Sequence, residues 1–351
     1  MSIYIQSATQ ISAQVPLSDA WFDAPLYHTE KKKLSNEPSF AGYLTPIMSR
    51  RMCNLLKRAI VTSRLTLQKA AIEIPDAIIC GTGLGCIENT ERFLYSIWEN
   101  EEQFLQPTYF MQSTHNIISS SIAIDIKCHG YNNTFVHRGT SFENALLDAL
   151  IQFKYQKIRS ALVGGFDELT SDYYIFFDRI GIWDFSKSDP SLPKTMCFAG
   201  EAAVSMLLQT ERNEQTLCEL NGVELIYRPS IAQIRESLHS LLTRTDCELS
   251  DIDAVVVGTN SNPANDAVYE DVVPQLLGKL PVIQYKHLFG QSFTSPALGT
   301  YVAALCLYKQ MIPAHLLTDS EENITRLKRI LLYNHYQNKS HSLVLLSRCL
   351  D

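Results

Sequence analysis

The sequence predicts an α/β protein built from two similar βα halves. Short β-branched runs alternate with longer helical patterns, which is typical of layered folds with parallel strands. One arrangement also occurs twice, because the apolar runs at residues 77–82 and 254–259 both end in Gly-Thr. These Gly-Thr pairs lie 177 residues apart, about half of the 351-residue chain. The repeat indicates a duplicated unit.

Each half continues with a second helix and a further strand. The helices begin with small residues and are expected over residues 141–156 and 295–310, where apolar side chains recur at helical spacing. The strands that follow them are expected at residues 160–163 and 342–346. A matched order of strand, helix and strand predicts a pseudo-twofold fold.

The two halves are expected to share one core. No linker of low complexity separates them, and the turn-prone segment 210–215 marks the boundary. The predicted units are residues 1–210 and 211–351. Coincidence is the alternative, since strands that end in glycine are common in α/β proteins.

Composition and charge exclude several classes of protein. The chain is 46% hydrophobic and 19% charged, as in ordinary globular proteins. Its formal charge of -7 argues against a nucleic-acid-binding protein, which usually carries a basic excess. The N-terminal residues read as a strand rather than a signal peptide, and no apolar run approaches the roughly 20 residues that cross a bilayer. We therefore predict a soluble, cytoplasmic protein.

The nine cysteines predict neither a metal site nor a disulfide framework. They occur singly, and no two have the spacing of a zinc knuckle or of a redox motif. An odd number of scattered cysteines favours a reducing compartment. The sequence gives no sign of a bound metal or cofactor.

Several segments occur in the order seen in one known family. They are, in chain order, the glycine-rich turn 81–85, the helix-like run 116–125, the strand-like run 130–136, the Gly-Gly strand end 163–168, the Gly-Glu segment 199–203, the Gly-Thr to Asn-Asp loop 258–266 and the Lys-to-Gly segment 286–290. Together they resemble the β-ketoacyl-acyl-carrier-protein synthases of the thiolase superfamily. The resemblance spans nearly the whole chain and implies the thiolase fold, with layers in the order αβαβα.

In that family the chemistry needs four residues and no cofactor. A cysteine at a helix N-terminus accepts an acyl group as a thioester, because the helix dipole favours its thiolate. Two histidines stabilise the enolate formed by decarboxylation, and a lysine supports one of them. A chain that condenses acyl groups in this way is expected to carry all four.

This chain carries only one of the four at the matching positions. The nucleophile position falls on Gly139, and the two histidine positions fall on Val257 and Gln291. Only the lysine is present, as Lys286. Glycine offers no nucleophile, valine no polar atom and glutamine no titratable group. The resemblance therefore implies a protein that cannot catalyse condensation.

Degenerate synthases of this kind are similar to the chain length factors of type II polyketide and aryl-polyene pathways. Residues 137–143 resemble the aryl-polyene and flexirubin type. The resemblance implies a heterodimer with a catalytic β-ketoacyl synthase, which acts on acyl chains held by an acyl carrier protein. Residues 133–136 are expected to pair with the partner's equivalent strand.

The residues around position 139 have more than one interpretation. His137, Arg138, Thr140 and Phe142 are predicted to line the pocket or the dimer interface, and a locally hydrogen-bonded turn is the alternative. Ser141 is a possible replacement nucleophile, although a serine hydroxyl needs an adjacent base and only His137 is near in sequence.

Three functions remain open at this point. The first is the non-catalytic subunit of a heterodimer, as described above. The second is an active 3-oxoacyl synthase with altered residues, which predicts a covalent acyl adduct. The third is a stand-alone homodimer that binds acyl chains reversibly. The missing catalytic residues argue against the second and do not separate the first from the third.

Overall fold

The computed structural model describes residues 1–351 except 31, 51, 184–196, 319–322 and 350–351. Its central feature is a ten-stranded sheet in the order β10-β9-β13-β14-β8-β1-β7-β5-β3-β4. These strands are β1 (Tyr4–Ile11), β3 (Ala77–Gly81), β4 (Tyr131–Phe135), β5 (Ser160–Asp167), β7 (Ala202–Gln209), β8 (Cys218–Tyr227), β9 (Ala254–Val257), β10 (Val282–Gln284), β13 (Arg329–Tyr336) and β14 (Ser340–Ser347). Two short pairs complete the strands: β2 (Lys32–Lys33) with β6 (Ala199–Gly200), and β11 (Met311–Ile312) with β12 (Ile324–Thr325).

The strand order confirms the predicted duplication. From the middle of the sheet, one half runs β1-β7-β5-β3-β4 and the other runs β8-β14-β13-β9-β10. In both halves the first two pairings are antiparallel and the next two are parallel. The halves meet where Tyr4 and Ile5 of β1 pair with Glu219 and Cys218 of β8.

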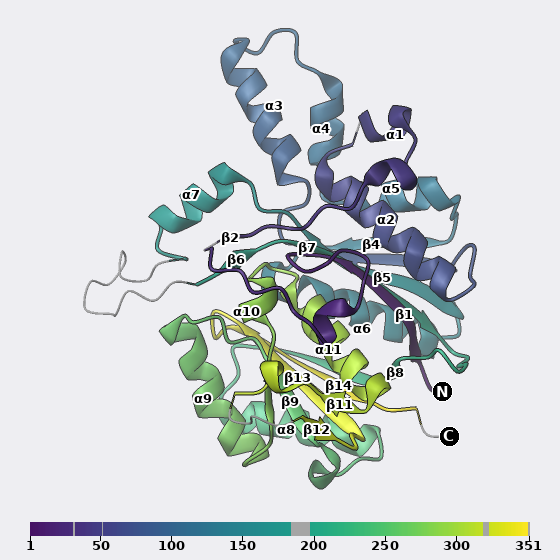
Figure 1. Ribbon diagram of the computed structural model, residues 1–351, viewed down its shortest axis with the longest axis vertical. Helices are drawn as coiled ribbons and strands as arrows, with labels where there is room; N and C mark the ends of the chain where they lie inside the picture. Colours follow the sequence, from purple (N-terminus) through teal and green to yellow (C-terminus); the bar gives the residue numbers. More distant parts are fainter. Residues whose placement is uncertain (31, 51, 184–196, 319–322, 350–351) are drawn as a thin grey trace.

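Helices cover and separate the two halves in five layers (Figure 1). The helices are α1 (Pro46–Arg50), α2 (Asn54–Lys69), α3 (Ile87–Glu99), α4 (Pro107–Ser113), α5 (Ile117–Ile126), α6 (Ser141–Lys154), α7 (Ser171–Arg179), α8 (Ile231–Arg244), α9 (Pro263–Leu277), α10 (Lys286–Phe289) and α11 (Ser295–Lys309). Helices α2 and α5 pack on the first half, α8 and α9 pack on the second, and α6 and α11 lie between the halves. This arrangement is the predicted αβαβα order.

The central position of α11 follows from its composition. Of its 15 residues, 13 are buried, and a helix that is apolar on all sides is stable only when other elements surround it. It ends at Lys309 because Gln310 takes the left-handed conformation, with φ of 54°. None of the described helices combines the length and the apolarity that a membrane crossing requires.

One predicted correspondence between the halves is wrong. The expected counterpart of β5 at residues 342–346 lies in β14, whereas the strand in the position equivalent to β5 is β13. The sequence pattern missed β13 because Asn334 and His335 interrupt its apolar run. Both side chains are nevertheless buried and hydrogen-bonded.

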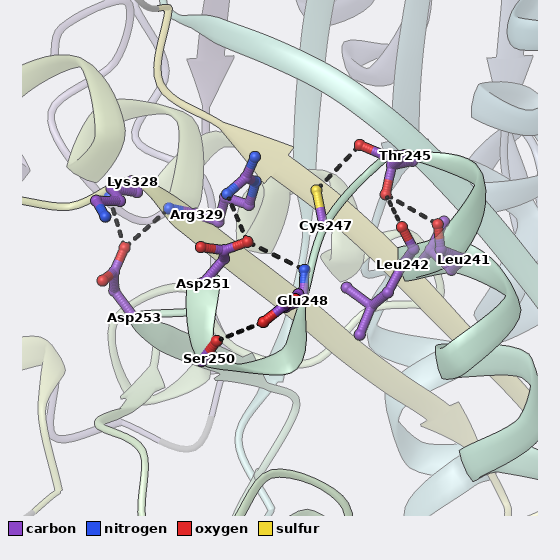
Figure 2. A network of polar contacts seen from close by, with 10 residues as sticks. All are labelled: Leu241, Leu242, Thr245, Cys247, Glu248, Ser250, Asp251, Asp253, Lys328 and Arg329. Carbon is purple, nitrogen blue, oxygen red and sulfur yellow. Dashed lines mark hydrogen bonds and ion pairs between the residues drawn. The ribbon is translucent and has the colours of Figure 1, made fainter.

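Polar contacts fix the beginning of β13 against the loop that follows α8 (Figure 2). The Thr245 hydroxyl donates to the carbonyl oxygens at the end of α8. Asp253 accepts hydrogen bonds from the backbone N–H groups of Lys328 and Arg329, and the Arg329 guanidinium lies 3.2 Å from Asp251. These contacts position the strand that carries Tyr336 at its far end.

Candidate functional site

A cavity of about 490 Å³ lies where the two halves meet. Its wall comes from α7, the segment before β6, the loops that follow β9 and α10, and the end of β13. The lining residues are Tyr173, Phe177, Ile180, Gly181, Ile182, Trp183, Cys197, Asn260, Asn262, Ala264, Asn265, Gln291, Ser292, Phe293, His335, Tyr336, Gln337 and Asn338. No Asp, Glu, Lys or Arg occurs among these described residues. A wall that combines aromatic and aliphatic side chains with neutral polar groups suits an uncharged ligand that has both apolar and polar parts.

Tyr336 fills the space in front of Gly139, where the sequence resemblance predicts the family's nucleophile position. A Cβ atom added at Gly139 would lie 2.5 Å from Cδ2 and 2.6 Å from Cβ of Tyr336. Such distances are far below ordinary van der Waals contact. Because the Cβ atom of Tyr336 is itself in the way, rotation of the ring does not make room. Only glycine fits at position 139 in this structure.

Lys286 is buried and has neutral partners. Its side-chain ammonium donates to the carbonyl oxygen of Gly258 at 2.9 Å and to Oε1 of Gln291 at 2.6 Å. The amide of Gln291 in turn donates to the carbonyl oxygen of Ser292 at 2.7 Å. Burial lowers the pKa of Lys286 to about 8 from its usual 10.5. Lys286 and Gln291 are therefore hydrogen-bond partners of each other, and Gln291 has no titratable group that could transfer a proton.

Glu143 is linked to Gly139 through Asn334 in a buried polar network. Its Oε1 atom accepts hydrogen bonds from Asn334 Nδ2 and from the Ser342 hydroxyl, both at 2.8 Å. Asn334 Nδ2 also donates to the carbonyl oxygen of Gly139 at 3.2 Å. The other carboxyl oxygen, Oε2, is buried without a partner. Burial raises the pKa of Glu143 to about 7 from its usual 4.5.

The raised pKa of Glu143 predicts a loss of stability as pH rises. The folded protein binds this proton more tightly than the unfolded chain, so the stabilisation is complete below about pH 4.5 and is lost as pH rises through 7. Relative to Glu143→Gln, we expect the wild-type free energy of unfolding to fall by about 2 kcal/mol between pH 5 and pH 8. Urea denaturation of both proteins across this range measures the difference, and parallel curves would contradict it.

A second buried carboxylate joins three segments beside the cavity. Asp167, at the end of β5, accepts hydrogen bonds from the backbone N–H of Gly83 at 2.8 Å and of Thr294 at 2.7 Å. The hydroxyl groups of Thr82 and Thr294 also donate to it. These bonds hold the turn after β3 and the start of α11 together, and the side chain of Phe293, from the cavity wall, packs against Gly83 of that turn.

The structure brings together only some of the residues that the sequence singled out. Lys286 and Gln291 are hydrogen-bonded to each other, and Lys286 is also hydrogen-bonded to Gly258, whereas Gly139 is hydrogen-bonded to Asn334. Val257 lies apart from these groups, because its side chain packs in the core between the second half and helices α8 and α9. Val257 is not among the residues of the cavity wall.

The residues next to Gly139 have mainly local contacts. The Ser141 hydroxyl donates to the carbonyl oxygen of Arg138 and accepts from the backbone N–H of His137, both at 2.8 Å. The Thr140 hydroxyl donates to the carbonyl oxygen of His137. Phe142 is completely buried in the core between the halves, not at the cavity wall. The structure thus places a hydrogen-bonded turn at residues 137–141.

Arg138 is the member of this turn that contacts two residues of the cavity wall. It is exposed, has a φ of 50° and places its guanidinium 5.7 Å from the centre of the Phe293 ring. It also interacts with Tyr336. Burial raises the pKa of the Tyr336 phenol, and the positive charge of Arg138 opposes that rise. Arg138 therefore packs over the two aromatic residues that close the site in front of Gly139.

Sequence reasoning missed the residues that determine this site. Tyr336 and Asn334 come from β13, which was not expected as a strand, and Glu143 shows no recognisable motif. Asn260 falls in the predicted Gly-Thr loop, and its amide lies 3.3 Å from Oε1 of Gln291. The polar interruption of an apolar run at residues 334–335 is the signal that could have pointed to them.

Comparisons with known proteins agree with this architecture. No protein-family model and no curated protein matches the chain. Among solved structures, the ishigamide ketosynthase/chain length factor is similar with a TM-score of 0.82 and 14% identity, covering 99% of each chain.

Two further solved structures are similar over nearly their full length. A β-ketoacyl synthase from Burkholderia phymatum has a TM-score of 0.79 at 14% identity, covering 99% of this chain and 100% of that one. The complex of the ketosynthase ApeO with its chain length factor ApeC from Xenorhabdus doucetiae has a TM-score of 0.78 at 15% identity, covering 99% and 98%. The chain therefore has the thiolase fold shared by β-ketoacyl synthases and chain length factors, as the sequence predicts.

Proposed function

We propose that this protein is a non-catalytic, chain-length-factor-like subunit that supports the elongation of carrier-bound acyl chains by a catalytic synthase. The observation that carries the proposal is the packing of Tyr336 on Gly139, which leaves no room for a nucleophile at that position. Lys286 supports it, because this ammonium is hydrogen-bonded to a glutamine and a carbonyl oxygen, and no histidine of the described residues is among its hydrogen-bond partners.

The contacts of Ser141 also favour the non-catalytic assignment. Its hydroxyl hydrogen is directed at a backbone carbonyl oxygen, and no imidazole nitrogen is among its hydrogen-bond partners. A serine becomes nucleophilic only when a base can accept its proton. An active synthase that uses Ser141 is therefore less well supported.

The proposed partner surface is the free edge of the sheet at β4. This strand is last in the sheet order and pairs with β3 on one side only. Tyr131, at its first position, and Val136, directly after its last, are 38% and 39% exposed. An open edge strand offers unpaired N–H and C=O groups to a second chain. Pairing there suits a heterodimer with a synthase of the same fold.

Co-expression with a catalytic synthase encoded beside this chain tests the partnership. We expect the two chains to co-purify in equal amounts, and we expect Val136→Glu to reduce recovery of the partner about tenfold, because a charge would be buried at the edge. Leu249→Glu, an exposed apolar position on the second half, is the matched control and should leave the complex intact.

Two results would contradict the proposed partnership. One is a chain that purifies alone whichever neighbouring synthase is expressed. The other is a complex that Val136→Glu and Leu249→Glu weaken equally, since the β4 edge would then not be the contact. Acyl carrier protein is expected to dock mainly on the partner, because carrier proteins are acidic and this chain has a formal charge of -7.

A further inference from the structure

A hydrogen-bonded carboxylate on α6 lies directly beside the free edge strand β4. Oδ2 of Asp148 accepts hydrogen bonds from the Tyr131 hydroxyl at 2.9 Å and from Nδ2 of Asn133 at 3.4 Å. Its Oδ1 accepts one from Nε2 of Gln152 at 3.1 Å. Tyr131 and Asn133 are alternate residues of β4, so both side chains lie on the face of the sheet that α6 covers. Asp148 therefore places a negative charge at this edge.

Among the described residues, Asp148 has no positively charged partner. The three groups that donate to it are neutral, and none of the ion pairs in the described part of the chain includes it. Its side chain is half-buried, so a second chain that pairs with β4 would take away most of its remaining contact with water. Burial of a carboxylate is unfavourable unless a cation accompanies it. The edge is thus suited to a partner that brings a lysine or arginine to this point.

A second copy of this chain meets this edge with the wrong charge. Two identical edge strands that pair about a twofold axis run antiparallel. In a pairing centred on Asn133, the middle residue of β4, the two Asn133 Cα atoms face each other roughly 5 Å apart. Each Asp148 lies beside its own Asn133 on the same face of the combined sheet, so the two carboxylates come within roughly 10 Å, the Debye length at about 0.1 M salt. Like charges at that separation repel and weaken self-association.

The other face of β4 carries a neutral hollow with an apolar group. The hollow has a volume of about 460 Å³ and is lined by Asn116, Ser119, Ser120, Ala123, Ile124, Asn132, Asn133 and Thr134, which belong to α5, the residue before it, and β4. Ile124 is 78% exposed, and no charged residue occurs among these described lining residues. A partner that fits both faces therefore carries a basic side chain on the α6 side and an apolar side chain on the α5 side.

We propose that Asp148 makes the β4 edge selective for a synthase subunit that brings a lysine or arginine to it, and disfavours pairing between two copies of this chain. The inference rests on the proposed function, because it takes β4 as the partner surface. Partner choice is set by repulsion of the wrong partner as well as by attraction of the right one. A cation on the partner forms an ion pair with Asp148, whereas a second copy brings a like charge.

Association between variants of the full-length chain tests the charge rule without any synthase. Wild type mixed with Asp148→Lys at low salt should form a mixed dimer about tenfold tighter than either protein forms with itself, because only the mixed pair joins opposite charges. Sedimentation velocity with one protein fluorescently labelled measures these affinities. Asp148→Asn, which keeps an acceptor oxygen, should strengthen self-association about threefold by removing the repulsion. The mixed-pair preference should shrink at high salt.

A charge reversal elsewhere on the surface is the matched control. Asp271→Lys, at an exposed aspartate of α9, should bind the wild type no more tightly than the wild type binds itself. Equal affinities for the mixed pair of wild type with Asp148→Lys and for both self-pairs would overturn the proposal. So would a synthase complex that Asp148→Lys does not weaken, and that result would leave the proposed function intact. The proposed function itself fails if no synthase co-purifies with the wild type.

Discussion

Replacement of Gly139 by cysteine, the residue that catalysis would need, is expected to destabilise the protein by about 3 kcal/mol. The new Cβ atom would lie 2.5 Å from the ring of Tyr336 and 2.6 Å from its Cβ atom, so the end of β13 must shift. The destabilisation should appear in urea denaturation as a lower midpoint with an unchanged slope. The variant should also fail to become acylated.

A second substitution separates this clash from other causes of instability. Tyr336→Gly removes the obstructing Cβ atom and ring, so it should offset part of the cost of Gly139→Cys. The coupling free energy between the two positions is expected to be about 2 kcal/mol, since residues in direct contact are not additive. Purely additive effects would show that Tyr336 does not exclude a side chain from position 139.

Replacement of Asp167 by alanine is expected to cost about 4 kcal/mol of folding stability. Two backbone N–H groups, of Gly83 and Thr294, and two hydroxyl groups would lose their acceptor in a fully buried place. The loss would loosen the turn after β3 and the start of α11 together. Chemical denaturation measures the effect.

An exposed aspartate provides the matched control for Asp167. Asp271, on the surface of α9, accepts a hydrogen bond from Gln275 in the next turn. Asp271→Ala should change the free energy of unfolding by less than about 0.5 kcal/mol, as surface substitutions usually do. A similar small effect for Asp167→Ala would show that this carboxylate does not hold the segments together.

The fold could be predicted from sequence because its signals are local and repeated. The two predicted strands that end in Gly-Thr correspond to β3 and β9. The two predicted helices that begin with small residues correspond to α6 and α11, and each ends within two residues of the predicted position. The strand β13 could not be predicted, since its buried Asn334 and His335 look like surface residues until their partners are known.

The site could be predicted only in part, for a related reason. The family resemblance assigns Gly139, Gln291 and Lys286 by position, and the structure joins Lys286 to Gln291 by a hydrogen bond. It does not show that Tyr336, almost 200 residues away in the chain, occupies the space in front of Gly139. Contacts of this range depend on how β13 packs against the turn at residues 137–141, and no local pattern encodes them.

The intact mass of this chain after incubation with an acyl-loaded carrier protein tests the central claim most directly. A competent β-ketoacyl synthase, treated in the same way, serves as the positive control. We predict that the control gains the mass of the acyl group while this chain stays unchanged, since position 139 has neither a nucleophile nor room for one. A stable mass increase on this chain, mapped to Ser141 or to any cysteine, would contradict the claim that it is non-catalytic.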